Sequence, residues 1–427
     1  MSTRPGFPRR PPDEVSPPLD RRVPRRVSSR RAAGQGRDPR STAGQDRPWH
    51  TALAMLAALA GMSVMAGLAP APRPPAAPRA VPPSRTTAPA ADAPVRTRAE
   101  VESLIQKAGA TPPDWWDSVT VNCPATVDLT WKEVKGPWDP SKNLGQFIWS
   151  IINENPGRWK EGAKLLHQVL PINKDNAARV AKTADALARV YHNLLGDWAR
   201  AAFWWRKTVA LDASYGEDLA PDLAHCYWKL GSKEMAVAAI RGFTSDDSRH
   251  GALVKLWSEM GDLDKALALA ERTAQAGYPD IGYLAAGDAC RLAGRYKEAL
   301  GYYQKVVGAN KGWNDIKQNK ARAQASIEAI RAVDGLDLSR VRDGTYNATS
   351  VAYAGPLSVA VTVAGGRIVS VKIFKHEEKQ YYTALADTPA QIVRKQGIKG
   401  VDAVTSATIT SEAIMNATVK ALAQGAK

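Results

Sequence analysis

The chain has 427 residues, which is more than one hydrophobic core usually holds, so we expect several folded units together with unfolded segments. The formal net charge of +16 is uneven, because residues 1–48 are rich in arginine and proline and contain no lysine. This stretch has too few apolar side chains to fold and lacks interleaved aromatic residues. We therefore interpret it as a disordered, solvated tail and expect no nucleic-acid partner.

Residues 49–69, WHTALAMLAALAGMSVMAGLA, carry no charge after His50. The run is long enough to cross a bilayer core, and the arginine-rich tail before it would stay in the cytoplasm. We expect an uncleaved single-pass anchor that places the following domains outside the cytoplasmic membrane, in the periplasm. A cleaved signal segment and a soluble cytoplasmic protein are the alternatives. Residues 70–99 are rich in proline and alanine and read as an extended linker.

Residues 100–150 contain five tryptophans, among them Trp115, Trp116, Trp131 and Trp138, but no motif that we can interpret. We expect residues 100–150 to cap the region that follows. The cysteines are odd in number and form no CxxC pair, and the histidines are scattered, so we predict no metal site. Cys226 and Cys290 lie in helical patterns and are interpreted as buried, inert thiols, whereas Cys123 stays open.

Residues 151–335 contain a repeated pattern in which a glycine is followed five residues later by an alanine. The glycines are Gly196, Gly231, Gly261 and Gly294, and the alanines are Ala201, Ala236, Ala266 and Ala299. We expect each glycine to end one helix in a left-handed turn and each alanine to allow close packing of the next helix. Large residues such as Trp205 and Tyr303 follow four positions later, and we interpret residues 155–166 as a degenerate first repeat.

This spacing resembles that of tetratricopeptide (TPR) repeats, most clearly over residues 186–212. The resemblance implies a helical solenoid whose concave face binds protein partners. Four tryptophans at helical spacing are interpreted as solenoid core rather than as a ligand site; they are Trp204, Trp205, Trp228 and Trp257.

From residue 340 to 427 the pattern changes to a small α+β domain with an antiparallel sheet. Residues 344–353 predict a strand, and 356–376 predict a hairpin that turns at Gly365 and Gly366. The hairpin's apolar face is expected to hold Val359, Val361, Val363, Val369, Val371 and Ile373. A helix opened by Thr388 and Pro389 and closed by Gly397 follows, then a short strand from Val401 and a final helix.

The stretch VDAVTSATITSEAIMNATVKAL, residues 401–422, places several hydroxyls at the corner before that last helix. One explanation is capping, in which Thr410 or Ser411 caps a helix that begins near Glu412. A helix N-terminus is also an anion site, and the small residues Ser406 and Ala407 would let a bulky anion approach the backbone. Capping explains one hydroxyl and leaves Thr405, Ser406 and Thr408 unexplained.

The motif DAVTSAT, residues 402–408, resembles the D-[AG]-x-[ST]-[GS]-A-T flavinylation motif of the FMN-binding domain family. This domain occurs in the C-type subunit of sodium-pumping NADH:quinone reductase and in the G-type subunit of the related ferredoxin:NAD complex. The hairpin end VKIFKHEE also fits the family, and the resemblance covers residues 340–426, about a fifth of the chain. Ser406 stands where glycine is more common in the family.

The resemblance implies that Thr408 carries FMN, esterified through the cofactor's phosphate by a flavin transferase that uses FAD and Mg²⁺ and releases AMP. It implies that Ala407, Ser406, Thr405 and Asp402 surround the attachment point. It also places His376 and Glu377 or Glu378 near the flavin edge. His376 is as readily explained as an ordinary surface histidine that follows a strand.

We therefore expect a membrane-anchored electron-transfer flavoprotein, with an extracytoplasmic or membrane redox protein docked on the TPR-like repeats. The sequence has no recognisable substrate pocket with its own acid and base, so a carrier is favoured over an independent enzyme. The main alternative is a cofactor-free, membrane-anchored scaffold that assembles other proteins. A flavin-dependent reductase of a small extracellular molecule is a third hypothesis.

Overall fold

The computed structural model describes residues 94–132, 136–242, 250–312, 316–379 and 382–426. The predicted tail and anchor, and most of the predicted linker, fall within residues 1–93 and lie outside this part of the chain. Among the described residues, no helix combines the length and the apolar character that crossing a membrane requires.

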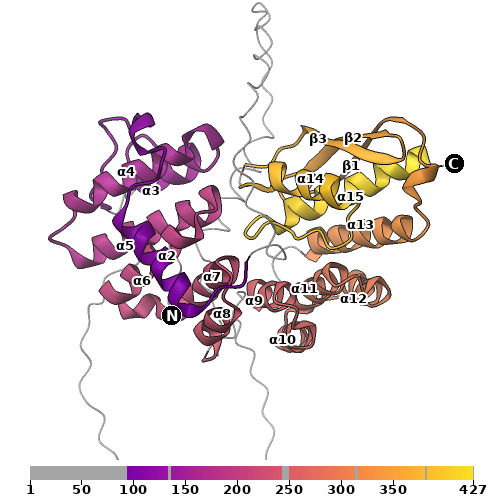
Figure 1. Cartoon of the computed structure of the whole chain (residues 1–427), viewed down its shortest axis with the longest axis horizontal. Helices are drawn as coiled ribbons and strands as arrows, with labels where there is room; N and C mark the ends of the chain where they lie inside the picture. The colour runs from indigo at the N-terminus through magenta and orange to yellow at the C-terminus, as the bar shows by residue number, and fades with distance from the viewer. Residues whose placement is uncertain (1–93, 133–135, 243–249, 313–315, 380–381, 427) are drawn as a thin grey trace, which may run out of the picture. The chain divides into compact units, whose positions relative to one another are not determined.

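The described chain begins with helices separated by irregular segments and continues as a succession of packed helices (Figure 1). Its first helices are α2 (Arg98–Ala110), α3 (Leu144–Phe147) and α4 (Trp159–Ile172). The next are α5 (Ala177–Arg189), α6 (Trp198–Leu211), α7 (Gly216–Lys229), α8 (Lys233–Ile240) and α9 (His250–Glu259). Then come α10 (Leu263–Gln275), α11 (Pro279–Leu292), α12 (Tyr296–Gly308) and α13 (Ile316–Asp334). We call α5 to α13 the helical region. Helices α5 to α8 each pack on the next helix in the chain, and so do α9 to α13.

The repeated glycines and alanines take the places that their spacing predicts. Gly196, Gly231, Gly261 and Gly294 all have positive φ, between 62° and 96°. Ala201, Ala236, Ala266 and Ala299 are completely buried. Trp204, Trp205 and Tyr303 are also buried, which confirms their interpretation as core, whereas Trp228 and Trp257 are half-buried. The predicted buried thiols Cys226 and Cys290 are confirmed as well.

One close helix contact gives a first prediction. A β-carbon added to Gly287 on α11 would lie 2.5 Å from Cε1 of Tyr303, whose ring is buried and whose hydroxyl donates to Asp288. Gly287→Ala is therefore expected to lower the free energy of unfolding by about 1–3 kcal/mol, measured by urea denaturation. A β-carbon added to Gly301 on α12 would meet no described atom within 4 Å beyond its own stretch of helix. Gly301→Ala is therefore expected to be neutral or stabilising by up to about 1 kcal/mol. Equal free energies for the two variants would contradict the contact.

The C-terminal domain is an antiparallel sheet with helices packed against it (Figure 1). Its strands are β1 (Gly344–Val351), β2 (Pro356–Ala364) and β3 (Arg367–Lys375), in the order β1-β2-β3 over the described residues. Helix α15 (Thr408–Gly425) packs on β1 and β2, and α14 (Ala384–Lys395) packs on β3 and α15. Helix α13 also contacts α15.

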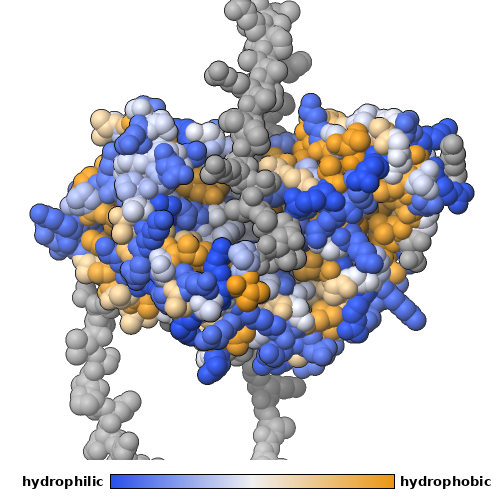
Figure 2. All heavy atoms as spheres, in the orientation of Figure 1, coloured by the Kyte–Doolittle hydropathy of each residue, from blue (hydrophilic) through white to orange (hydrophobic). Residues whose placement is uncertain are grey.

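The apolar side chains of the sheet and of α15 form one core in this domain. Leu357, Val359, Val361 and Val363 of β2 are buried against Ile414 and its neighbours on α15. Figure 2 shows hydrophilic residues over much of the visible face, with hydrophobic residues in smaller patches between them.

The hairpin differs from the prediction at Val369, which is 51% exposed, while Ile368 is buried. Val363 pairs with Ile368 and Thr362 pairs with Ser370, so Val369 is an extra residue on β3. A β-bulge of this kind moves the residues beyond it to the opposite face of the strand.

Two other predicted boundaries in this domain are wrong. Helix α14 begins at Ala384 rather than at Thr388, and Pro389 lies inside it. Residues Val401–Val404 form a loop rather than a strand. The side-chain amide of Gln391 bonds both the amide and the carbonyl of Asp402, which replaces the hydrogen bonds that a neighbouring strand would supply.

Candidate functional site

The loop of residues 401–407, which we call the motif loop, leads directly into the first turn of α15. Thr408 is the first residue of the helix and is partly exposed, and Ala407 at the N-cap provides no side-chain hydrogen bond. Within the described first turn there is also no acidic residue. The N-terminus of an 18-residue helix therefore presents its amides and its positive end without a cap at Thr408.

The predicted capping by Thr410 or Ser411 is wrong, because both residues lie inside α15. Ser411 Oγ instead accepts a hydrogen bond from the amide of Val404 at 3.0 Å and donates to the carbonyl of Ala407 at 3.1 Å. The hydroxyl of Thr410 donates to Glu378. Ser411 thus fixes the motif loop to α15, and Thr410 fixes the end of the hairpin to the same helix. Neither hydroxyl caps the helix, so its N-terminal end stays open.

The motif loop is compact at its small residues. Ala403 and Ala407 are buried, Thr405 and Asp402 are partly exposed, and Ser406 is exposed. Ser406 has φ 67°, a left-handed conformation that favours glycine, the residue that the motif resemblance leads us to expect at this position.

Of the two glutamates predicted near the flavin edge, Glu378 contacts α15, and the role of either near a flavin stays a prediction. Glu378 is 5% exposed and accepts hydrogen bonds from the amide of Ala354 at 2.6 Å and from the hydroxyl of Thr410. Glu377 is exposed, next to Gly355. His376 lies directly after β3 and is partly buried, and its role near a flavin stays a prediction.

Residues of the helical region also contact the motif loop, and sequence reasoning missed them. Asp402 pairs with Lys229 of α7 at 3.3 Å and with Lys255 of α9 at 2.9 Å. Both lysines also pair with Glu259, whose side chain is 2% exposed. Burial alone would raise the pKa of Glu259, but Lys229 and Lys255 outweigh it and lower that pKa to about 2. The same carboxylates hold the pKa of Lys229 above its usual value despite burial.

A chain of hydrogen bonds joins Thr405 to two buried imidazoles. His225 Nε2 lies 3.0 Å from Thr405 Oγ1, and His225 Nδ1 lies 2.8 Å from His192 Nε2. His192 Nδ1 lies 2.6 Å from Asn193 Oδ1, which also accepts from Ser406 Oγ at 3.3 Å. With both imidazoles neutral, every donor in this chain has an acceptor, because Thr405 donates to His225, His225 to His192 and His192 to Asn193.

The surroundings of this chain favour the neutral form of His225. Burial first, and then His192, Lys229 and Lys255, hold the pKa of His225 well below its usual value. The ring of Trp198 packs edge-on against both imidazoles, with centroid distances of 5.2 Å. The sequence signal for this surface was the four-residue spacing of His225 and Lys229 on one helix face, repeated by Lys255 and Glu259.

A second buried polar cluster holds α15 from the other side. Arg322 of α13 donates to Glu412 at 2.9 Å, and their side chains are 12% and 4% exposed. Arg291 of α11 donates to the carbonyl of Val401 at 3.3 Å. Burial, and then the charge of Glu412, hold the pKa of Asp288 well above its usual value.

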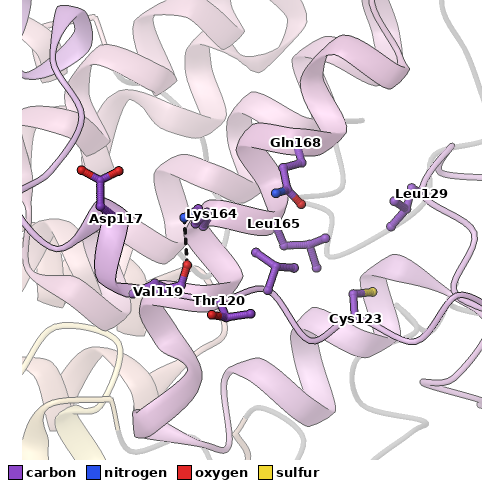
Figure 3. Close-up of a pocket in the computed structure, with 9 residues that line it drawn as sticks. Asp117, Val119, Thr120, Cys123, Leu129, Lys164, Leu165 and Gln168 are labelled. Carbon is purple, nitrogen blue, oxygen red and sulfur yellow. Dashed lines mark hydrogen bonds between the residues drawn. The ribbon is translucent and has the colours of Figure 1, made fainter.

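A cleft elsewhere in the molecule does not involve the motif loop. It has a volume of ≈ 550 Å³ and is lined by the N-terminal region and α4, at Asp117, Val119, Thr120, Val121, Cys123, Leu129, Lys164, Leu165 and Gln168 (Figure 3). Lys164 donates to the carbonyls of Trp116 and Val119 at 2.8 Å each, so its ammonium group is already hydrogen-bonded to the protein. Burial raises the pKa of Cys123, which disfavours a reactive thiolate there. In the described part of the chain no group of acids, histidines and cysteines could hold a metal.

Comparison with known proteins identifies the C-terminal domain. Residues 352–423 match the family model of the FMN-binding domain. An uncharacterized protein of Treponema pallidum (strain Nichols) is 39% identical over 88 residues, which are 20% of this chain and 24% of that protein. The chain thus matches about a quarter of the length of this relative. No solved structure matches the chain. The family resemblance drawn from the motif is confirmed, and this part of the chain is an FMN-binding domain.

Proposed function

Since residues 352–423 form an FMN-binding domain, we propose that the chain is an electron-transfer flavoprotein that carries FMN covalently on Thr408. One observation carries the attachment site: Thr408 stands at the uncapped N-terminus of α15. A phosphate ester at this hydroxyl would lie against the free first-turn amides and the positive end of the helix dipole.

The donor set at this position fits a phosphate. The residue before Thr408 is alanine, so no larger side chain occupies the helix end, and Ser411 and Thr410 are engaged with the loop and with Glu378. In the attachment step the Oγ1–P bond to Thr408 forms and the pyrophosphate bond of FAD breaks. AMP leaves, and the hydroxyl proton passes to solvent or to a base of the transferase.

FMN supplies the electron-transfer chemistry when it is bound, and the protein supplies its attachment, orientation and electrostatic surroundings. We propose that the anchor predicted at 49–69 places this domain outside the cytoplasmic membrane. There a covalent bond prevents the loss of a cofactor that could not be recovered. We also propose that the helical region is TPR-like and docks a redox partner protein through surfaces that the FMN-binding domain leaves free.

The proposal is tested by producing the full chain in an exported form together with a flavin transferase. The denatured protein is separated on a gel and viewed under ultraviolet light. Wild type is expected to fluoresce, and Thr408→Val to be dark, because valine keeps the shape of threonine but has no hydroxyl. Thr418→Val is the matched control on the same helix, since Thr418 bonds only the carbonyl of Ile414 among the described residues, and it should keep its flavin.

A dark wild-type band, with a transferase that labels a known acceptor protein, would refute covalent attachment. The cofactor-free scaffold would then be the better interpretation, unless the native protein held FMN without a covalent bond.

A further inference from the structure

The helical region presents buried polar and charged side chains to the motif loop. His225 is 5% exposed, and the side chains of Lys229 and Lys255 are 13% and 17% exposed. Burying histidine and lysine in a helical core is costly unless they are paired. Their partners include Thr405 and Asp402 of the FMN-binding domain.

The pattern of contacts is geometrically matched on the two sides. His225 and Lys229 are four residues apart and project from one face of α7. Thr405 and Asp402 are three residues apart on the motif loop. Thr405 contacts His225, and Asp402 contacts Lys229. Asn193 then accepts from the exposed residue Ser406. Residues of the helical region therefore contact the motif loop at Asp402, Thr405 and Ser406, the last of which is two residues before Thr408.

The charges of this surface balance. Lys229 and Lys255 share Glu259, so two lysines face one carboxylate within the helical region. Asp402 supplies the second carboxylate, and without it the lysines would hold an uncompensated, largely buried charge. Asp402 thus has an electrostatic reason to lie where it does that is independent of the FMN-binding domain's own core.

We propose that Asn193, His225, Lys229 and Lys255 of the helical region are positioning residues of the FMN site. They hold the motif loop in the flavin-free protein so that Thr408 remains at the open end of α15. This inference rests on the proposed function, and it makes the helical region a part of the flavin site. A redox partner must then dock on another surface of the helical region.

The test measures hydrogen exchange of the full chain, produced without transferase, in peptides that cover residues 401–407. Lys255→Met removes one charge but leaves Lys229 to compensate Glu259. Thr405→Val removes the hydroxyl that bonds His225 and keeps the shape of the side chain. Lys255→Met is expected to raise the exchange rate of the motif loop about tenfold, because its bond is to a charged group, and Thr405→Val about fivefold, because its bond is to a neutral imidazole.

Lys233→Met is the control, because Lys233 pairs with Asp262 inside the helical region at 2.8 Å. It should leave exchange of the motif loop unchanged. A contact-specific readout comes from Asp402→Asn combined with Lys255→Met, which should exchange no faster than the faster single variant. A purely structural role of Lys255 would instead give effects that multiply.

Wild-type exchange rates in both Lys255→Met and Thr405→Val would overturn the proposal, because the loop would then be held by other contacts, such as those of Gln391, Ser411 and Arg291. If Lys255→Met exchanges faster throughout the β-sheet as well, Thr405→Val decides the question. Covalent flavin is measured separately on wild type with transferase. Its absence would refute the proposed function, whereas the exchange experiment on flavin-free protein would still test the loop contact.

Discussion

Replacing Arg322 by methionine is expected to lower the free energy of unfolding by about 3–5 kcal/mol, the usual cost of leaving a buried charge without its partner. Arg322 joins α13 to Glu412 of α15, and both side chains are nearly inaccessible to solvent. Burial raises the pKa of Glu412, but Arg322 and its other partners outweigh burial and keep that pKa below its usual value. Without Arg322 the carboxylate must either stay ionised at high cost or take up a proton.

The measurement is urea denaturation at neutral pH, with Arg295→Met as the control. Arg295 pairs with Glu298 on an exposed surface, where such a pair contributes at most about 1 kcal/mol. The double variant Arg322→Met with Glu412→Leu should recover most of the lost stability, since both buried charges are then gone. A loss below about 1 kcal/mol in Arg322→Met would show that the pair does not hold α15 in place.

Stability is expected to fall as the pH drops from about 6.5 toward 4. Burial first, and then Arg200, lower the pKa of His167 to about 4, and burial and nearby cations lower that of His225 as well. In the unfolded chain both imidazoles titrate near 6.5, so between these values the unfolded state binds more protons than the folded state. The stability contributed by the neutral imidazoles is complete above about 6.5 and is lost at lower pH, by up to about 3 kcal/mol for His167 alone.

The check is the free energy of unfolding from urea denaturation at several pH values between 7.5 and 4.5. His167→Gln should reduce the slope against pH by about one proton, because its imidazole no longer titrates. Carboxylates with low pKa values, such as Glu259, lose their contribution below this window and do not produce the same slope. A slope that is unchanged in His167→Gln would contradict the assignment.

The sequence predicted best those features that follow from local geometry. The left-handed glycines at 196, 231, 261 and 294 and the buried alanines after them are set by how a helix ends and how closely its neighbour packs. The hairpin of β2 and β3 followed from alternation and from the Gly365–Gly366 turn.

The predictions that failed depend on contacts between distant residues. Val369 faces solvent because of a bulge that alternation alone does not reveal. The helix start at Thr408 was misplaced because Ser411 and Thr410 bond the loop and Glu378 instead of capping. The contacts of Asp402 with Lys229 and Lys255 join residues more than 140 positions apart, which no local pattern encodes.

The observed start of α15 at Thr408 also supports Thr408 as the attachment residue. A hydroxyl-rich corner whose hydroxyls do not cap the helix leaves the end of α15 available at Thr408. The family motif and the open helix end are independent observations, since one comes from residue identity and the other from the hydrogen bonds of residues 410 and 411.

The most direct test of the central claim is peptide mapping by mass spectrometry of the full chain produced with a flavin transferase. The account predicts that the peptide containing residues 402–408 gains the mass of FMN less one water, and that fragmentation places the added mass on Thr408. An added mass on Thr405, Ser406 or Thr410, or an unmodified peptide from protein exposed to an active transferase, would contradict it.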